Sequence, residues 1–109
     1  MDFAESRRRM VDGQLRPNRV TDPLLLDALR SLPRELFLPP ALRSRAYLDE
    51  DVAIPDAPGR VLVEPLVIAR LVQLAAARPG DRVLVVCAGT GYGAALLGHL
   101  GARVIAVED

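Results

Sequence analysis

A glycine-rich segment near the end of the chain carries the residues whose types and spacing are most suited to chemistry. Residues 82–109 read RVLVVCAGTGYGAALLGHLGARVIAVED, with Gly89 and Gly91 between an apolar run and a helical pattern. Glycines in such a turn let the backbone approach a ligand and leave the first amides of the next helix free to bind it. Glu108 follows Gly89 by 108 − 89 = 19 residues, close to the spacing of about 20 for an acid that binds ribose hydroxyls. The segment therefore predicts a site for a nucleotide-containing cofactor.

This spacing leaves more than one interpretation open. Gly89-x-Gly91-x-x-Ala94 also matches the dinucleotide fingerprint G-x-G-x-x-G/A, so an NAD-dependent oxidoreductase fits as well. The glycines could instead serve only a tight turn between a strand and a helix. Cys87 is expected to be a small buried residue rather than a nucleophile, and Tyr92 either lines the cofactor pocket or packs its helix.

The elements around this segment predict an α/β fold. An apolar helical pattern from residue 64 to 75 indicates a largely buried helix, and residues 82–86 form the short continuous apolar run of a strand covered on both faces. An apolar helix and a second β-branched run at residues 103–107 follow, which is the start of a parallel sheet with a right-handed crossover. Two strands leave sheet edges unpaired, so we expect a truncated piece of a doubly wound domain that could self-associate through such an edge.

The first part of the chain predicts helices and irregular segments. Residues 3–14 read as a polar helix ending near Gly13, in which the Arg7-Arg8-Arg9 run forms a solvated face. Thr21 is predicted to cap a helix over residues 24–32, which Pro33 stops, with one further turn at residues 34–37. Pro39-Pro40 predicts extended backbone, and residues 43–65 predict a long irregular connection. We therefore divide the chain into a cap region, 1–64, and the start of a cofactor-binding domain, 65–109.

Composition excludes several classes of function. The chain has 109 residues, 50% of them hydrophobic, and 14 basic residues that balance 14 acidic ones. This is the composition of a globular protein without a field that attracts nucleic acid or anionic lipid. The longest apolar runs fall far short of the length that a membrane helix needs. The single cysteine predicts a reducing, cytoplasmic setting, and the adjacent acids at residues 49–51 form no metal site.

Successive blocks of the sequence resemble the protein-L-isoaspartate O-methyltransferase family. The blocks are MVDGQLR (10–16), VTDPLLLDAL (20–29), PRELFLP (33–39), AYLDED (46–51), GRVLVEP (59–65) and PGDRVLVVCAGTGYGAALL (79–97). The resemblance implies a Rossmann-like domain that binds S-adenosyl-L-methionine and methylates the free carboxyl of isoaspartyl residues in damaged proteins. It implies that Gly89, Thr90 and Gly91 hold the methionine and ribose side of the cofactor, beside Cys87 and Tyr92, and that Glu108 binds the ribose hydroxyls.

The sequence departs from the family pattern at three places. Cys87 stands at the first glycine of the glycine-rich turn, and Val85 at the acidic residue two positions earlier. Val61, Leu62 and Val63 replace a Thr-Ile-Ser run whose serine the family assigns to catalysis. An apolar loop supplies no side-chain donor for a substrate carboxylate. The catalytic residue is therefore unassigned, and a decayed, non-catalytic binding or interaction module is the alternative.

Overall fold

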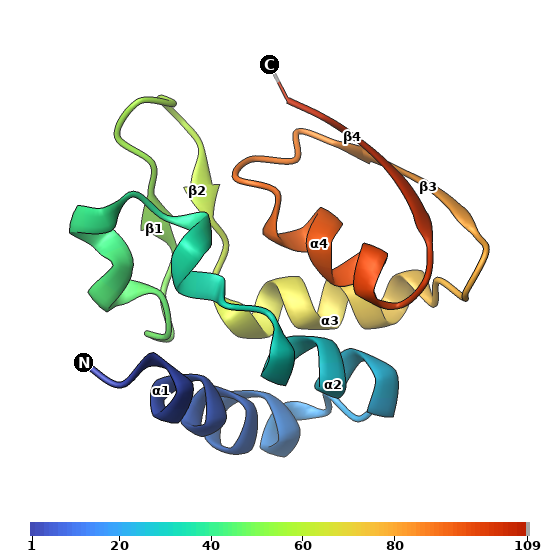
Figure 1. The fold of residues 1–109 in the computed structure, drawn as a ribbon, viewed down its shortest axis with the longest axis horizontal. Helices are drawn as coiled ribbons and strands as arrows, with labels where there is room; N and C mark the ends of the chain where they lie inside the picture. The colour runs from blue at the N-terminus through green and yellow to red at the C-terminus, as the bar shows by residue number, and fades with distance from the viewer. Residues whose placement is uncertain (109) are drawn as a thin grey trace.

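A computed structural model describes residues 1–108 as a bundle of short helices beside a small βαβ unit (Figure 1). Helices α1 (Phe3–Arg9), α2 (Pro23–Ser31) and α3 (Pro65–Ala75) lie on one side of the molecule, and strands β3 (Arg82–Val86) and β4 (Arg103–Val107) lie on the opposite side. Helix α4 (Tyr92–His99) lies between α3 and these strands. A single hydrophobic cluster of buried side chains connects the N-terminal helices to α3 and α4. No helix within these described residues has the length and apolar character that crossing a membrane requires.

The N-terminal helical segment is longer than the sequence pattern predicts. Helix α1 (Phe3–Arg9) continues as a π-helical stretch (Met10–Leu15) and a 3-10 turn (Arg16–Asn18). The helical backbone predicted for residues 3–14 thus extends to Leu15, one residue beyond its expected end, and the 3-10 turn follows it. The buried side chains of Met10, Val11 and Leu15 stabilise this segment, because tertiary packing outweighs the weak helix propensity of one glycine.

Helix α2 (Pro23–Ser31) is present as predicted, but its capping residue differs. Asp22 occupies the N-cap position, without a side-chain cap hydrogen bond, so the prediction that Thr21 caps the helix is wrong. The backbone amides of Thr21 and Asp22 instead donate to Oε1 of Gln73, at 2.9 and 3.1 Å. A side chain of α3 thus satisfies two backbone donors just before the helix, whereas a capping side chain accepts from amides inside its first turn.

The segment between α2 and α3 contains more order than predicted. The turn Arg34–Phe37 is a 3-10 helix as expected, and a second 3-10 helix spans Pro40–Arg45. Pro39 has the expected extended backbone, whereas Pro40 starts a helix, which proline favours at a first helical position. The connection predicted to be irregular contains the antiparallel pair β1 (Val52–Ala53) and β2 (Val61–Leu62).

The last third of the chain forms the predicted parallel βαβ unit. Helix α3 (Pro65–Ala75) leads to β3 (Arg82–Val86), α4 (Tyr92–His99) and β4 (Arg103–Val107). Strands β3 and β4 pair in parallel, with Arg82 opposite Arg103 and Val86 opposite Val107. This register places the carboxyl ends of both strands at the same edge.

The sheet is covered on one face only, which corrects the expectation of cover on both. Val83, Val85 and Val104 pack against the core. Successive strand residues point to opposite faces, and Leu84, Val86, Ile105 and Val107 are 63, 67, 70 and 49% exposed. Helix α3 is also less buried than predicted, because Leu71 and Leu74 are 55 and 78% exposed. Among residues 1–108, α4 is the helix that covers this sheet, and it covers its inner face.

Candidate functional site

The glycine-rich segment forms a loop at the carboxyl ends of β3 and β4. The amide of Ala88 donates to the carbonyl of Val107 at 3.0 Å, which ties the loop to the end of β4. Gly89 and Gly91 have φ of 62° and 92°, a left-handed conformation that favours glycine. Helix α4 begins directly afterwards at Tyr92. The loop therefore has the strand–turn–helix geometry that the sequence predicts.

Cys87 is exposed, so the expectation that it is a small buried residue is wrong. The loop bends outward directly after β3, and Cys87 has a φ of 57° there. This left-handed backbone is the conformation that glycine adopts without strain. The backbone therefore gives a physical reason for the glycine that the resemblance expects at this position.

Glu108 lies beside the loop, at the end of β4, and it pairs with an arginine that the sequence did not single out. Nε of Arg60 lies 3.2 Å from Oε1 of Glu108, and Nη2 of Arg60 lies 3.6 Å from Sγ of Cys87. A Cβ on Gly89 would lie 4.0 Å from Oε2 of Glu108. Arg60 precedes β2 in a segment without regular pattern, so its approach to Glu108, 48 residues away, leaves no signal in the sequence.

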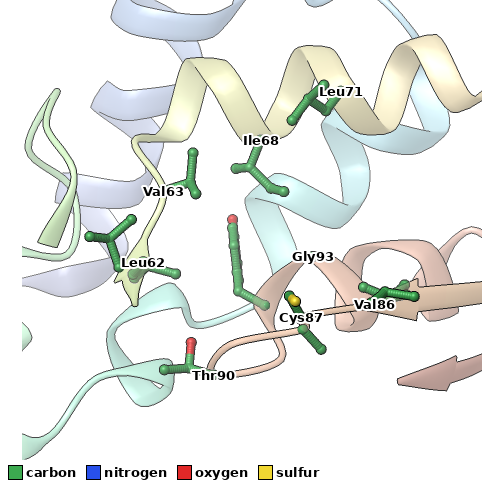
Figure 2. A pocket seen from close by; sticks show the side chains of 12 residues that line it. Leu62, Val63, Ile68, Leu71, Val86, Cys87, Thr90 and Gly93 are labelled. Carbon is green, nitrogen blue, oxygen red and sulfur yellow. The ribbon is translucent and has the colours of Figure 1, made fainter. Parts of the chain in front are cut away.

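A cavity of about 280 Å³ lies on the inner side of the loop (Figure 2). Residues 61–63 form one wall, Ile68 and Leu71 of α3 form a second, and residues from the end of β3 to the start of α4 form a third. In Figure 2, Leu62 and Val63 lie across the cavity from Thr90 and Cys87. The apolar wall that the sequence predicts in place of Thr-Ile-Ser thus faces the glycine-rich loop.

A smaller cavity of about 200 Å³ lies at the carboxyl ends of the two strands, lined by Val86, Cys87, Val107 and Glu108. It shares Val86 and Cys87 with the larger cavity. The six residues predicted to bind cofactor lie around one loop, and four of them line two adjoining spaces. Thr90 and Tyr92 line the larger one, Glu108 lines the smaller one, Cys87 lines both, and Gly89 and Gly91 line neither. Their role in binding stays a prediction.

Tyr92 lines the larger cavity and also packs its helix onto the core, as one sequence interpretation expected; that this cavity holds a cofactor stays a prediction. Tyr92 is 2% exposed, and its ring packs edge-on against Phe37 with centroids 5.4 Å apart. Burial raises the pKa of its phenol. Its hydroxyl has no hydrogen-bond partner among residues 1–108, and neither has Oγ1 of Thr90, which is also buried.

Arg34, which the sequence did not identify, is fully buried behind Tyr92. Its Nε donates to the carbonyl of Ala46 at 2.6 Å, and its Nη2 donates to the carbonyl of Val63 at 2.8 Å. Its Cζ lies 4.9 Å from the centroid of the Tyr92 ring, a cation–π arrangement. Burial lowers the pKa of Arg34. This side chain fixes the cavity wall at Val63 relative to the start of α4.

A second polar cluster supports the same region from the N-terminal helix. Arg7 donates from Nε to the hydroxyl of Tyr47 at 2.8 Å and from Nη2 to Oε1 of Glu35 at 3.1 Å, and Tyr47 also donates to Glu35. Burial and the bond to Glu35 raise the pKa of Tyr47 to about 12. The Arg7 side chain is 15% exposed, so the prediction that the arginine run is a solvated face is wrong for Arg7.

Comparison with known proteins decides the family. A family model described as protein-L-isoaspartate(D-aspartate) O-methyltransferase matches residues 5–109. The chain belongs to this family. It is similar to the protein-L-isoaspartate O-methyltransferases of Methylorubrum extorquens strain PA1, with 45% identity over 98% of this chain and 46% of the relative, and of Aeropyrum pernix, with 43% identity over 97% and 41%.

Solved structures share the fold. A protein-L-isoaspartate O-methyltransferase has a TM-score of 0.76 at 27% identity, over 94% of this chain and 33% of that one. A putative protein-L-isoaspartate O-methyltransferase from Plasmodium falciparum, in complex with S-adenosyl-L-homocysteine, has a TM-score of 0.67 at 18% identity, over 99% and 49%. The fold of this family member is therefore the Rossmann-like one expected. The chain spans about half the length of the curated relatives that it matches.

Proposed function

We propose that the protein is an S-adenosyl-L-methionine-dependent methyltransferase that methylates the free carboxyl of isoaspartyl residues in protein or peptide substrates. The observation that carries the proposal is the position of Glu108, at the carboxyl end of β4, beside Gly89 of the loop that follows β3. An acid in this place binds ribose hydroxyls in nucleotide-binding α/β folds. Family membership supports the methyltransferase over the nicotinamide-dependent alternative.

The residues present fit this cofactor. The left-handed loop leaves open space at Gly91, where a Cβ would meet nothing within 4 Å, and the first amides of α4 follow it directly. We assign Cys87, Gly89, Thr90, Gly91 and Tyr92 to the side of the loop that faces the cofactor, and Glu108 to its ribose. When bound, the cofactor supplies an electrophilic methyl group, and a substrate carboxylate oxygen displaces the sulfur to form an ester. The apolar walls exclude water from that displacement.

We further propose that residues 65–109 begin the cofactor-binding domain and that residues 1–64 cover its site. Arg60, from the covering region, contacts Glu108 and Cys87 across the proposed boundary, which supports this division. The charge balance gives no reason to expect nucleic acid or a membrane as a partner. A cytoplasmic setting fits the single free thiol of Cys87.

Calorimetric titration of the protein, as its gene encodes it, with S-adenosylhomocysteine and with NADH tests the cofactor. We expect S-adenosylhomocysteine to bind and NADH not to bind. Glu108→Ala should weaken S-adenosylhomocysteine by about tenfold or more, since a hydrogen bond to a charged group contributes about 1.5–3 kcal/mol. Glu50→Ala is the matched control, because Glu50 also pairs with an arginine, Arg45, outside both cavities. Binding of NADH alone would contradict the proposal.

Methyl transfer to an isoaspartyl peptide tests the substrate separately. Labelling of the peptide supports the proposal, whereas cofactor binding without labelling rejects isoaspartyl carboxyl as the acceptor. The alternative of a decayed module predicts a different pattern. In that case the protein fails to bind S-adenosylhomocysteine, and the double variant Val63→Ser, Cys87→Gly gains binding.

A further inference from the structure

Arg60 connects the β1–β2 hairpin to the glycine-rich loop. Its backbone is fixed at the base of the turn between the two strands, because its amide donates to the carbonyl of Ala57 at 2.9 Å and its carbonyl accepts from the amide of Ile54 at 3.1 Å. Its side chain leaves the hairpin and reaches Glu108, with Nε 3.2 Å from Oε1, and Cys87, with Nη2 3.6 Å from Sγ. One side chain thus joins the hairpin to the carboxyl ends of both parallel strands.

The backbone of the hairpin also lies close to the loop. A Cβ on Gly89 would lie 4.0 Å from the carbonyl oxygen of Val61, the residue after Arg60, and 4.0 Å from Oε2 of Glu108. Arg60 therefore contacts one oxygen of the Glu108 carboxylate, while the other is turned toward the loop. The two oxygens of a carboxylate together accept about four hydrogen bonds, so Arg60 and a ligand beside Gly89 can both donate to Glu108.

The ion pair provides a positive charge where a ligand would remove water from Glu108. Glu108 is the carboxylate among the four described residues that line the smaller cavity. The side chains of Arg60 and Glu108 are 36 and 30% exposed, so water weakens the attraction between them. A ligand that fills the cavity displaces this water. Desolvating an unpaired carboxylate is costly, whereas a neighbouring guanidinium offsets part of that cost.

We infer that Arg60 is a positioning residue for the cofactor, which holds the Glu108 carboxylate toward Gly89 and couples binding at that carboxylate to closure of the hairpin on the loop. The inference rests on the proposed function, in which Glu108 binds the ribose hydroxyls. The attraction between Arg60 and Glu108 strengthens when water is displaced. By thermodynamic linkage, a contact that favours binding is itself favoured by binding. A bound ligand therefore also holds the hairpin in place.

The coupling extends to the apolar wall of the larger cavity. Arg60 directly precedes residues 61–63, which form that wall, and Nη2 of Arg34 donates to the carbonyl of Val63 at 2.8 Å. Two arginines thus hold the two ends of the wall. The Arg34 side chain is fully buried, whereas that of Arg60 is partly exposed. The end held by Arg60 is therefore the one that a ligand at Glu108 can tighten.

Calorimetric titration with S-adenosylhomocysteine tests the positioning role in a double-mutant cycle. The protein, as its gene encodes it, is compared with Arg60→Ala, Glu108→Ala and the double variant. We expect Arg60→Ala to weaken binding by about threefold to fivefold, the upper range for a partly exposed ion pair. In the Glu108→Ala background the same substitution should leave the dissociation constant unchanged, because Arg60 acts through Glu108. Arg60→Lys, which keeps the positive charge, should recover part of the loss.

Hydrogen exchange of the hairpin amides tests the coupling. The amides at positions 54 and 60 both donate across the turn of the hairpin, so their exchange reports how firmly the turn is held. We expect saturating S-adenosylhomocysteine to slow exchange at both positions in the wild type and to leave it unchanged in Arg60→Ala. Equal protection in the two proteins would overturn the coupling.

Arg45→Ala is the matched control, because Arg45 also forms a partly exposed ion pair, with Glu50 at 2.7 Å, outside both cavities. We expect it to change neither the dissociation constant nor the hairpin exchange. Unchanged or tighter binding by Arg60→Ala would overturn the positioning role, as would an equal loss in the Glu108→Ala background. Failure of the wild type to bind S-adenosylhomocysteine would instead refute the proposed function.

Discussion

At the scale of single residues, Cys87 has a backbone conformation that disfavours its side chain. Its φ of 57° lies in the left-handed region. A Cβ there costs about 1–2 kcal/mol, and glycine loses about 0.5–1 kcal/mol more than other residues through its greater freedom in the unfolded chain. We therefore expect Cys87→Gly to raise the free energy of unfolding by about 0.5–1 kcal/mol, measured by chemical denaturation. Cys87→Ala is the control, because it removes the thiol and keeps the strain; an equal gain in both variants would contradict this explanation.

Tyr47 predicts how stability changes at alkaline pH. Burial and the hydrogen bond to Glu35 raise its pKa from 10.0 to about 12 in the folded protein. The unfolded phenol releases its proton near pH 10, whereas the folded one keeps it, so this stabilisation is fully present below pH 10 and is lost as pH rises through about 12.

We expect Tyr47→Phe to flatten the loss of stability across that range. One proton fewer is released on unfolding, which reduces the slope by about 1.4 kcal/mol per pH unit at most. Tyr92, whose pKa burial also raises, contributes equally to both proteins. Unfolding free energies measured by urea titration from pH 9 to 12 provide the comparison, and parallel curves for the two proteins would exclude Tyr47 as the group responsible.

The sequence identified the residues of the glycine-rich turn, but not the arginines around them. Gly89, Gly91 and Glu108 could be found because their role depends on local spacing along one strand–turn–helix unit. Arg7, Arg34 and Arg60 act through contacts 12 to 48 residues away. A long arginine side chain reads as a surface residue in any local pattern. Only tertiary packing buries Arg34 over the ring of Tyr92 and brings Arg60 to Cys87 and Glu108.

At the scale of elements, two glycines at the end of α4 serve different purposes. Gly98 lies inside the helix, and a Cβ there would meet nothing within 4 Å. Gly101 ends the helix with φ of 92°, and a Cβ there would lie 3.1 Å from Pro79 backbone. We expect Gly98→Ala to stabilise the protein by about 0.5–1 kcal/mol. Gly101→Ala should destabilise it by at least as much, because both strain and a clash arise. Thermal unfolding of the two variants should therefore show melting temperatures that shift in opposite directions.

The elements that the sequence predicted correctly are those with long, regular patterns. The apolar run at β3, the β-branched run at β4 and the periodic helix α3 all lie within a residue or so of their expected bounds. The pair β1 and β2 has two residues in each strand, too few for any alternation to be recognised. The second 3-10 helix begins at Pro40, where proline also fits an extended interpretation. The local sequence therefore does not distinguish a 3-10 helix from extended backbone at Pro40.

At the scale of the whole molecule, the core and the apolar surface occupy opposite sides of one sheet. The inner face of β3 and β4 joins a core that runs through α4 to the N-terminal helices. The outer face exposes four large apolar side chains in adjacent register, and a shallow cavity lies over Leu84 and Ile105. Contiguous apolar patches of this kind are interaction surfaces or aggregation sites. The continuous apolar runs predicted a sheet that is covered on both faces. Such a run shows that both faces are apolar, but it does not show whether a neighbouring element covers each of them.

We predict that the polypeptide of residues 1–109 self-associates through this outer face and its unpaired strand edges. Leu84→Glu places a charge at the centre of the patch, where desolvating it in an interface is costly. Since Leu84 is 63% exposed, the folded chain tolerates the charge. Sedimentation velocity from low to high micromolar concentration should show larger species for the wild type and a monomer for Leu84→Glu. Leu24→Glu is the control, because Leu24 is 57% exposed on α2, on a different element from the patch. If both variants are monomeric, the association does not depend specifically on the outer face of the sheet. A wild type that is monomeric at all concentrations would refute the predicted self-association.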